Sequence, residues 1–142
     1  RGFQEAQHEG TVLVAYTNDW ADIAKAKEAS FNLISQDADV ILPYLDAGWV
    51  GVAQAAEERG IHTVGILHES DTNLTSARLD FARALSWAVG MYKEGTLEPT
   101  DYVIHLTSAD QLGDFSDVVS EEVRALAMEA VEKIKSGELT FD

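Results

Sequence analysis

The stretch YTNDWADIAKAKEASFNLISQDADVILPYLDAGWVGVAQAAEERGIHTVGI, residues 16–66, alternates helix-like segments with short apolar runs. Asp22 can cap a helix predicted over residues 23–35, because its carboxylate can accept a free N–H of the first turn. A second helix is predicted over residues 50–59 and ends at Gly60, a residue that readily takes the left-handed conformation that closes helices. This alternation is typical of an α/β protein.

Four short runs rich in β-branched residues are predicted as strands. Their ranges are residues 11–17, 39–45, 61–67 and 102–106. None alternates strictly between apolar and polar residues, so both faces of each strand are expected to be buried, as in a parallel sheet. The order of strands and helices predicts right-handed crossovers and a Rossmann-like sheet covered by helices on both faces, in three layers.

Two further helices are predicted towards the C-terminus. One covers about residues 76–94 after an extended loop and closes at Gly95. The other covers residues 120–135, with Ser120 as its cap and carboxylates in its first turn. The loops around the first of these helices are long enough to cross into a neighbouring lobe. The 142 residues are therefore expected to be part of a larger structural unit.

Composition narrows the function classes. The formal net charge is −15, the pI is near 4.4, and no Lys/Arg stripe is present, which argues against nucleic acid and anionic membrane surfaces as partners. The absence of cysteine excludes disulfides and thiolate chemistry. With 46% hydrophobic residues, a core of normal size is expected. Because the chain opens at Arg1 rather than Met, it is interpreted as a processed product or a fragment.

Polar and aromatic residues follow the predicted strands where each strand ends. In open α/β sheets ligands bind at the carboxyl ends of the strands, so these residues are expected to lie along one edge. The three groups are Asn18, Asp19 and Trp20; Asp46, Ala47, Gly48 and Trp49; and His68, Glu69, Ser70 and Asp71.

Each group has a structural and a functional interpretation. Trp20 either packs against the edge of the sheet or presents a flat face on which a ligand stacks. Asp46 either turns the chain and caps the next helix, or accepts hydrogen bonds from a ring N–H or from sugar hydroxyls. Glu69 and Asp71 are expected to be solvated loop charges, and the position of His68 alone assigns it no chemistry.

Motifs of catalysis are absent from the sequence. It contains no GxGxxG, no Walker loop and no GxSxG elbow, and its four histidines do not form an HExxH metal motif. Asp46 imitates the phosphoacceptor of a receiver domain only in part, because the accompanying acidic pair and lysine are not placed for that chemistry. A stacking surface with acceptor groups but no nucleophile or base predicts a binding protein that is not an enzyme and uses no metal or cofactor.

The quoted stretch resembles the basic membrane protein (BMP) family of substrate-binding lipoproteins of ABC transporters. That family carries T/S-x-F/W-x-D-P-A-K-x-K-E-A, then LI-x-Q-G-A-D-V-I, and then Q-A-A-x-E-x-G. The later segments LTS, residues 74–76, and KIKSGEL, residues 133–139, also match the family. The matching positions of the quoted stretch are Trp20, Asp22, Ala24, Lys25, Lys27, Glu28, Leu33, Ile34, Gln36, Ala38, Asp39, Val40, Ile41, Gln54, Ala55, Ala56, Glu58 and Gly60.

The resemblance implies a type I periplasmic-binding-protein fold, in which two α/β lobes close on a ligand. Residues 1–142 would be mostly the C-terminal lobe, with residues 76–98 belonging to the missing first lobe or exchanging with it, so that a homodimer of the isolated lobe is one expected assembly. The implied function is binding of a small ligand, often a purine nucleoside or nucleobase, for an ABC permease. The whole protein would be lipid-anchored in the periplasm or on the extracellular face of the membrane.

The resemblance also implies roles in the site. In the family the aromatic residue at the position of Trp20 stacks on the base. Asp46 falls in the loop that contacts the ligand, where a carboxylate can accept purine N–H donors in charge-assisted hydrogen bonds. Gly48, Trp49 and His68 complete the predicted ligand-binding set.

One departure from the family concerns the ligand. Family members often carry G-V-D-S-D after the third strand, with an Asp that reaches the ribose, whereas GILHESD places Leu67 or His68 there. A base, a modified nucleoside and an unrelated small molecule therefore stay open. Two other function classes also stay open. One is a stand-alone flavodoxin-like signalling or interaction domain that binds a protein through its acidic surface, and the other is an enzyme such as a nucleoside hydrolase.

Overall fold

The computed structural model describes residues 10–102 and 112–140, and its centre is a three-stranded parallel sheet. The strands are β1 (Val40–Ile41), β2 (His62–Ile66) and β3 (Asn73–Ala77), in the spatial order β1-β2-β3. Both neighbouring pairs run parallel. The parallel α/β sheet predicted from the apolar runs is therefore confirmed.

Helices α2 (Ile23–Ile34) and α3 (Trp49–Arg59) confirm the two helices predicted from the central stretch. Asp22 caps α2, because its carboxylate accepts the backbone N–H of Lys25 at 2.9 Å. Helix α3 ends at Gly60, whose φ of 65° lies in the left-handed region that glycine adopts without steric cost.

The two helices cross closely at a glycine. A Cβ atom built on Gly51 of α3 would lie 2.1 Å from the carbonyl oxygen of Ile23 and 2.9 Å from the backbone nitrogen of Lys27, so only glycine permits this approach. The helices pack over the carboxyl end of β1. The core cluster there consists of Ala26, Ile41 and Val52, with Leu33, Ile34, Leu45 and Ile61 partly buried around it.

The connection between β2 and β3 is unusually short. Parallel neighbours normally need a crossover of a dozen or more residues, but here residues 67–72 are enough. At one end Leu67 takes a left-handed φ of 65° and donates its N–H to the carbonyl of Ala77 at 3.0 Å. At the other end the N–H of Thr63 donates to the carbonyl of Thr72 at 2.9 Å. Strand β3 thus replaces most of the extended loop expected after the third strand.

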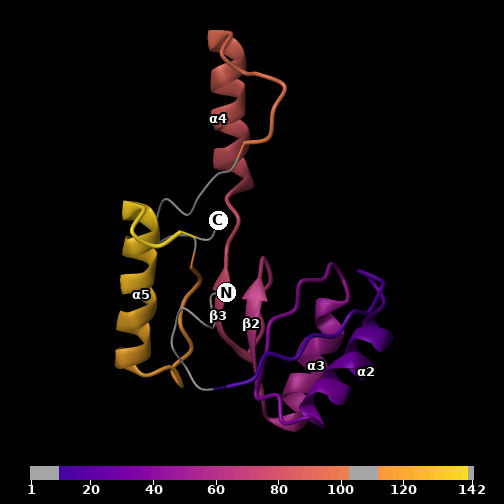
Figure 1. The fold of residues 1–142 in the computed structure, drawn as a ribbon. Helices are drawn as coiled ribbons and strands as arrows, with labels where there is room; N and C mark the ends of the chain where they lie inside the picture. The colour runs from indigo at the N-terminus through magenta and orange to yellow at the C-terminus, as the bar shows by residue number, and fades with distance from the viewer. Residues whose placement is uncertain (1–9, 103–111, 141–142) are drawn as a thin grey trace.

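Helix α4 (Phe81–Glu94) starts later than the helix predicted from residue 76, because residues 76 and 77 still belong to β3. Asp80 marks its start by accepting the N–H of Arg83 at 2.8 Å, and Gly95 closes it as predicted. Figure 1 shows α4 pointing away from the sheet beyond the end of β3. None of its residues is buried.

Helix α5 (Glu121–Ser136) confirms the last predicted helix, with Ser120 as its cap. Figure 1 draws α5 on the side of β3 and draws α2 and α3 on the side of β2. The segment before it is tied to β3, because the N–H of Gly113 donates to the carbonyl of Ser76 at 2.7 Å. None of the helices in the described part of the chain is long and apolar enough to span a bilayer.

Two strand predictions need correction. Residues 11–17 form no strand, and in the described part of the chain they make no backbone hydrogen bonds with the sheet. Their β-branched side chains suit a strand, but strand propensity forms no strand without a neighbour to pair with. The strand predicted over residues 39–45 shrinks to β1, because Pro43 has no N–H for a ladder. The strand predicted over residues 102–106 lies, from residue 103 onwards, outside the described residues.

The core is smaller than the composition suggested. The chain exposes 10185 Å² of surface, whereas a compact monomer of its mass is expected to expose roughly 7,200 Å². Much apolar side-chain surface therefore lacks cover, notably on α4 and along residues 11–17. In the described structure the buried apolar residues are Ala26, Ile41, Val52, Ala55, Ala56 and Val131.

Candidate ligand-binding site

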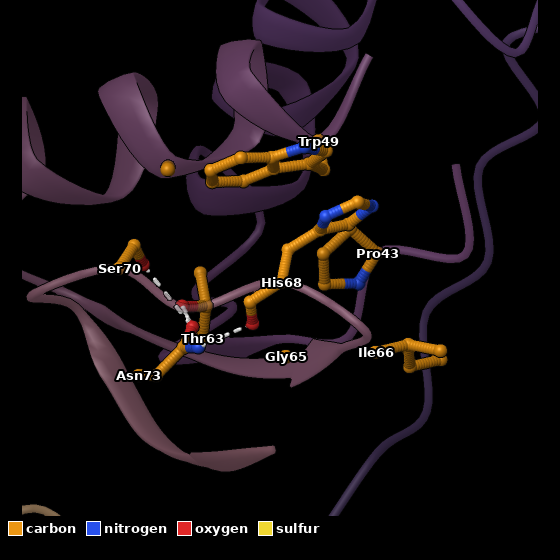
Figure 2. A pocket seen from close by; sticks show the side chains of 9 residues that line it. Pro43, Trp49, Thr63, Gly65, Ile66, His68, Ser70 and Asn73 are labelled. Atoms are coloured by element: carbon orange, nitrogen blue, oxygen red, sulfur yellow. Dashed lines mark hydrogen bonds between the residues drawn. The ribbon is translucent and has the colours of Figure 1, made fainter. Parts of the chain in front are cut away.

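The loops that follow β1 and β2 meet at the carboxyl-terminal edge of the sheet. Trp49 opens α3 at the end of the first loop, and His68 lies near the start of the second. The imidazole of His68 stacks on the indole of Trp49, with ring centres 4.7 Å apart and ring planes inclined by 11° (Figure 2). Both side chains are half-buried. Two of the predicted site residues are therefore in direct contact.

The segment that carries Trp20 reaches the same edge through Gly48. The backbone N–H of Gly48 donates to the carbonyl of Trp20 at 3.0 Å. Gly48 is buried, and a Cβ atom on it would lie 3.0 Å from that same carbonyl oxygen. Because Gly48 has no side chain, the two backbone segments can approach each other closely. This contact brings the predicted group that contains Trp20 next to the one that contains Asp46 and Trp49.

The indole of Trp20 is 60% exposed. It makes an edge-to-face contact with Tyr44, whose ring centre lies 5.7 Å away at an interplanar angle of 76°. An edge-to-face contact uses one side of a ring system and leaves flat surface accessible. The structure thus shows Trp20 partly packed on Tyr44 and largely open to solvent.

A tight turn sets the position of Trp20. The Asp19 carboxylate accepts the backbone N–H groups of Ala21 at 2.9 Å and of Asp22 at 3.0 Å. These N–H groups, in that order of importance, hold the pKa of the Asp19 carboxyl below its usual value, because they stabilise the charged form. Asn18 takes a left-handed φ of 54°, which asparagine tolerates better than most residues.

Asp46 is exposed, and its backbone carbonyl accepts the N–H of Trp49 at 3.0 Å within the turn that starts α3. Gly48, rather than Asp46, is the N-cap residue of that helix, and no side chain caps it. Within the described residues the Asp46 carboxylate makes neither a hydrogen bond nor an ion pair. Its acceptor oxygens are therefore available at the edge where Trp49 lies.

A network of hydrogen bonds fixes the loop that carries His68. The Asn73 side-chain oxygen accepts the hydroxyls of Thr63 at 2.6 Å and of Ser70 at 3.1 Å, while its Nδ2 donates to the His68 carbonyl at 3.0 Å (Figure 2). The Thr72 hydroxyl lies 2.9 Å from the hydroxyls of both Thr63 and Ser70. The network pairs the buried Thr63 hydroxyl, as burial of a polar group requires.

Several residues of the recess beside the stacked rings are not among the predicted site residues. The sequence holds two indications of them. Thr63 is a polar residue in an otherwise apolar strand, and SDTN, residues 70–73, is a cluster of turn-forming residues. The unpredicted lining residues are Pro43, Ala53, Thr63, Gly65, Ile66 and Asn73, which join Trp49, His68 and Ser70.

Glu69 and Asp71 are both exposed, in line with the expected solvated loop charges. The Glu69 carboxylate pairs with the Arg78 guanidinium at 2.7 Å. Together with Asp114 and Asp117, the two carboxylates border a second, open and acidic hollow. In the described part of the chain, no group of three His, Asp or Glu side chains is arranged to hold a metal ion.

Comparisons with known proteins bear on the family. The family model of PnrA-like ABC transporter substrate-binding proteins, Bmp, matches residues 1–123. A purine-binding protein of Brucella abortus (strain 2308) is 29% identical over 158 residues, which cover 97% of this chain and 40% of that protein. The chain therefore spans less than half the length of this curated relative.

Solved structures share the fold. A transcriptional activator of the comK gene from Bacillus halodurans is 27% identical, with a TM-score of 0.76, and the match covers 90% of this chain and 48% of that one. An ABC transporter solute-binding protein from Conexibacter woesei is 24% identical with a TM-score of 0.72, covering 99% and 49%. One from Aeropyrum pernix is 17% identical with a TM-score of 0.74, covering 98% and 50%.

The solved structures extend well beyond the matched part. Each match takes in nearly all of this chain and about half of the other, as expected for one lobe of a two-lobed fold. The family model covers well over half of the sequence, including the stretch that carries the BMP resemblance. The chain therefore belongs to the family of PnrA-like ABC transporter substrate-binding proteins.

Proposed function

We propose that this chain is the ligand-binding C-terminal lobe of a solute-binding protein of an ABC uptake transporter, and that its ligand is a purine nucleoside or nucleobase. The proposed site consists of Trp20, Asp46, Gly48, Trp49 and His68. The observation that carries the proposal is that backbone hydrogen bonds bring the segments of the exposed Trp20, of Asp46 and of the stacked Trp49 together at one edge of the sheet. The description of the Brucella relative as purine-binding supports the ligand class.

The chemistry of these side chains suits a purine. Indole faces stack on any planar heterocycle, and each such stack is worth about 1–3 kcal/mol when measured by alanine substitution in nucleic-acid-binding proteins. The Asp46 carboxylate can accept N–H donors of the base in charge-assisted hydrogen bonds. The proposed action is therefore binding and release of the ligand for the transporter, in line with the family.

The family supplies the biological setting of the proposal. A substrate-binding protein of an ABC transporter hands its ligand to a permease, so the permease is the proposed protein partner. The whole protein would work in the periplasm or on the extracellular face of the membrane, held there by a lipid anchor.

The proposal includes a division of the chain. Residues 76–98, with α4, pack on the first lobe of the whole protein or exchange with a second copy of this lobe. The support is that α4 buries no residue and exposes Phe81, Leu85 and Tyr92 by 64%, 67% and 75%. Such a surface needs cover in a stable assembly. Light scattering of the isolated chain that shows a monomer throughout the micromolar range argues against exchange between copies.

Substitution of Trp20 tests the proposed function. Affinity for adenosine and guanosine is measured by calorimetry in the two-lobed protein, and Trp20→Ala is expected to weaken it about ten- to hundredfold. Trp87→Ala is the matched control, because Trp87 lies on α4 and packs edge-to-face on Tyr102 instead. Unchanged affinity in Trp20→Ala contradicts the placement of Trp20 in the site. If no purine binds the unsubstituted protein, the ligand class is wrong.

A second candidate function is regulatory. It is favoured by the 27% identity with a protein described as a transcriptional activator. In that case the same lobe would sense a ligand without serving transport, as in the signalling alternative. Uptake of labelled nucleoside by cells that lack the gene separates the two functions: uptake falls if the protein feeds a permease and is unchanged if it only senses.

A further inference from the structure

The stacked pair of Trp49 and His68 joins two elements that are far apart in the sequence. Trp49 is the first residue of α3, and His68 belongs to the short return between β2 and β3. Their rings are almost parallel, inclined by 11° with centres 4.7 Å apart, which is a stacked and not an edge-to-face arrangement (Figure 2). One face of the Trp49 indole is therefore occupied by a flat nitrogen heterocycle of the protein itself.

Hydrogen bonds fix the His68 backbone, whereas its ring is stacked on Trp49. The Asn73 amide donates to the His68 carbonyl at 3.0 Å, and the neighbouring Leu67 N–H donates to Ala77 at 3.0 Å. In the described part of the chain, neither imidazole nitrogen makes a hydrogen bond. Rotation about the His68 side-chain bonds can therefore remove the ring from Trp49 without disturbing the loop.

The chemistry of the ring points to what else can lie on that face. An imidazole is the five-membered half of a purine, with the same planar, nitrogen-containing π-system. A face of Trp49 that accommodates imidazole in parallel contact is accordingly shaped and polarised for a larger fused heterocycle. The recess beside the stacked rings, with Pro43 and Ser70 in its lining, is small, so a larger ring needs the space that the imidazole occupies.

We propose that His68 is a built-in occupant of the ligand face of Trp49, which a planar heteroaromatic ligand displaces when it binds. This inference rests on the proposed function and extends it to a second stacking residue and to a residue that lowers affinity. When a side chain of the protein fills the site for most of the time, the ligand can bind only the fraction of molecules in which the site is free. The apparent affinity is then the intrinsic affinity multiplied by that fraction. His68 thereby sets the affinity and favours ligands that stack better than imidazole.

The test varies the occupant while leaving Trp49 in place. In His68→Ala the face is free, so binding of adenosine and guanosine to the two-lobed protein is expected to tighten about two- to tenfold, the range of one aromatic pair. In His68→Phe a more apolar ring takes the place of imidazole, and binding is expected to be weaker than in His68→Ala. His62→Ala, at the opposite end of β2, is the matched control and should bind like the unsubstituted chain.

A second readout follows the ring itself. In NMR spectra the imidazole protons of His68 should be shifted upfield by the Trp49 ring current, and Trp49→Leu should abolish this shift. Saturating nucleoside should abolish it as well, because the ligand expels the imidazole. A purely structural stack predicts instead that the upfield shift persists in the ligand complex. Circular dichroism of each variant confirms that it is folded before its affinity is compared.

The outcomes separate this inference from the proposed function. Tighter binding by His68→Ala, or binding by that variant alone, supports displacement. If nucleosides bind the unsubstituted chain and bind His68→Ala equally or more weakly, the displacement inference is wrong while the proposed function stands. If nucleosides bind neither the unsubstituted two-lobed protein nor its His68→Ala variant, even at millimolar concentration, both the purine ligand and the inference are overturned.

Discussion

Helices α2 and α4 resemble each other in sequence but differ in what surrounds them. Each begins at an aspartate whose carboxylate accepts the N–H of the third residue beyond it, Asp22 in α2 and Asp80 in α4. Each carries an apolar stripe. Yet α2 packs against α3 over the core, whereas α4 has no buried residue and stands apart from the sheet (Figure 1).

Local sequence therefore decides where a helix begins and ends, whereas the elements packed against the helix decide how much it stabilises the fold. An isolated helix of fewer than about 12–15 residues is marginal in water, and α4 is close to that length. Helix α2 is no longer than α4, but its packing against α3 and β1 supplies burial that capping cannot. The stability of the described lobe should therefore reside in the α2–α3–β1 region, and α4 should depend on a partner.

Truncation of an apolar side chain in each region should show the largest contrast. Ile41 is 7% exposed at the centre of the core cluster, so Ile41→Ala is expected to lower the free energy of unfolding by about 2–4 kcal/mol. Leu85 on α4 is 67% exposed, so Leu85→Ala should change that free energy by less than about 0.5 kcal/mol. Urea denaturation of both variants, each compared with the unsubstituted chain, gives the two values.

The result for Leu85 carries the information about α4. If Leu85→Ala destabilises the chain by more than about 1 kcal/mol, as burial of a leucine implies, the α4 face is covered in solution. The dependence of that loss on protein concentration then shows whether a second copy provides the cover. A small effect of Ile41→Ala would instead mean that the core lies elsewhere.

Substitution of one glycine by alanine in each region is expected to change stability in opposite directions. A Cβ on Gly51 meets the backbone of α2 at 2.1 Å, so Gly51→Ala should destabilise the lobe by about 1–3 kcal/mol through overpacking. A Cβ on Gly90 of α4 meets nothing within 4 Å, so Gly90→Ala should stabilise that helix by up to about 1 kcal/mol. Urea denaturation measures the first effect, and hydrogen exchange of the α4 amides measures the second.

The signs matter more than the magnitudes in this pair. A destabilising Gly90→Ala would show that α4 is packed closely against another body in solution. A neutral Gly51→Ala would mean that α2 and α3 can separate without loss, which contradicts their role as the stable part of the lobe.

Sequence patterns predicted the parts of the fold that depend on neighbours along the chain. Asp22, Gly60 and Ser120 place the ends of three helices by hydrogen bonds or backbone conformations that act within one turn. Strand β3, NLTSA, has weak strand propensity and forms because β2 lies beside it. Residues 11–17 show the reverse, since their strand propensity is high but no edge in the described structure pairs with them.

The candidate site was predictable to the same degree. The ends of the strands correctly indicated the edge where Trp49 and His68 meet, because parallel strands carry their carboxyl ends to one side. The stacking itself was not predictable, since it depends on the left-handed Leu67 and on the hydrogen bonds of Asn73 across the return loop. Those features arise from the tight β2–β3 connection, which no local pattern encodes.

The smallest expected effect concerns Asp19, whose turn leads into α2. Its carboxyl pKa is lowered in the folded state, first by the N–H of Ala21 and then by that of Asp22. A carboxyl with a lowered pKa stabilises the fold above its ordinary value, and this contribution is lost as the pH falls through the lowered pKa. In Asp19→Asn an amide oxygen can accept the same bonds without titrating, so the variant should be less stable near neutral pH and converge with the unsubstituted chain in acid. Melting temperatures from about pH 6 down to about pH 2, around the ordinary carboxyl range, test this.

Asp80→Asn on α4 is the control, and its melting temperature should stay close to that of the unsubstituted chain, because asparagine caps helices as well as aspartate does and α4 buries no side chain. A gap between Asp19→Asn and the unsubstituted chain that stays constant down to the lowest pH would mean that the two N–H bonds do not favour the charged carboxylate, and that the turn presenting Trp20 is held by its backbone alone.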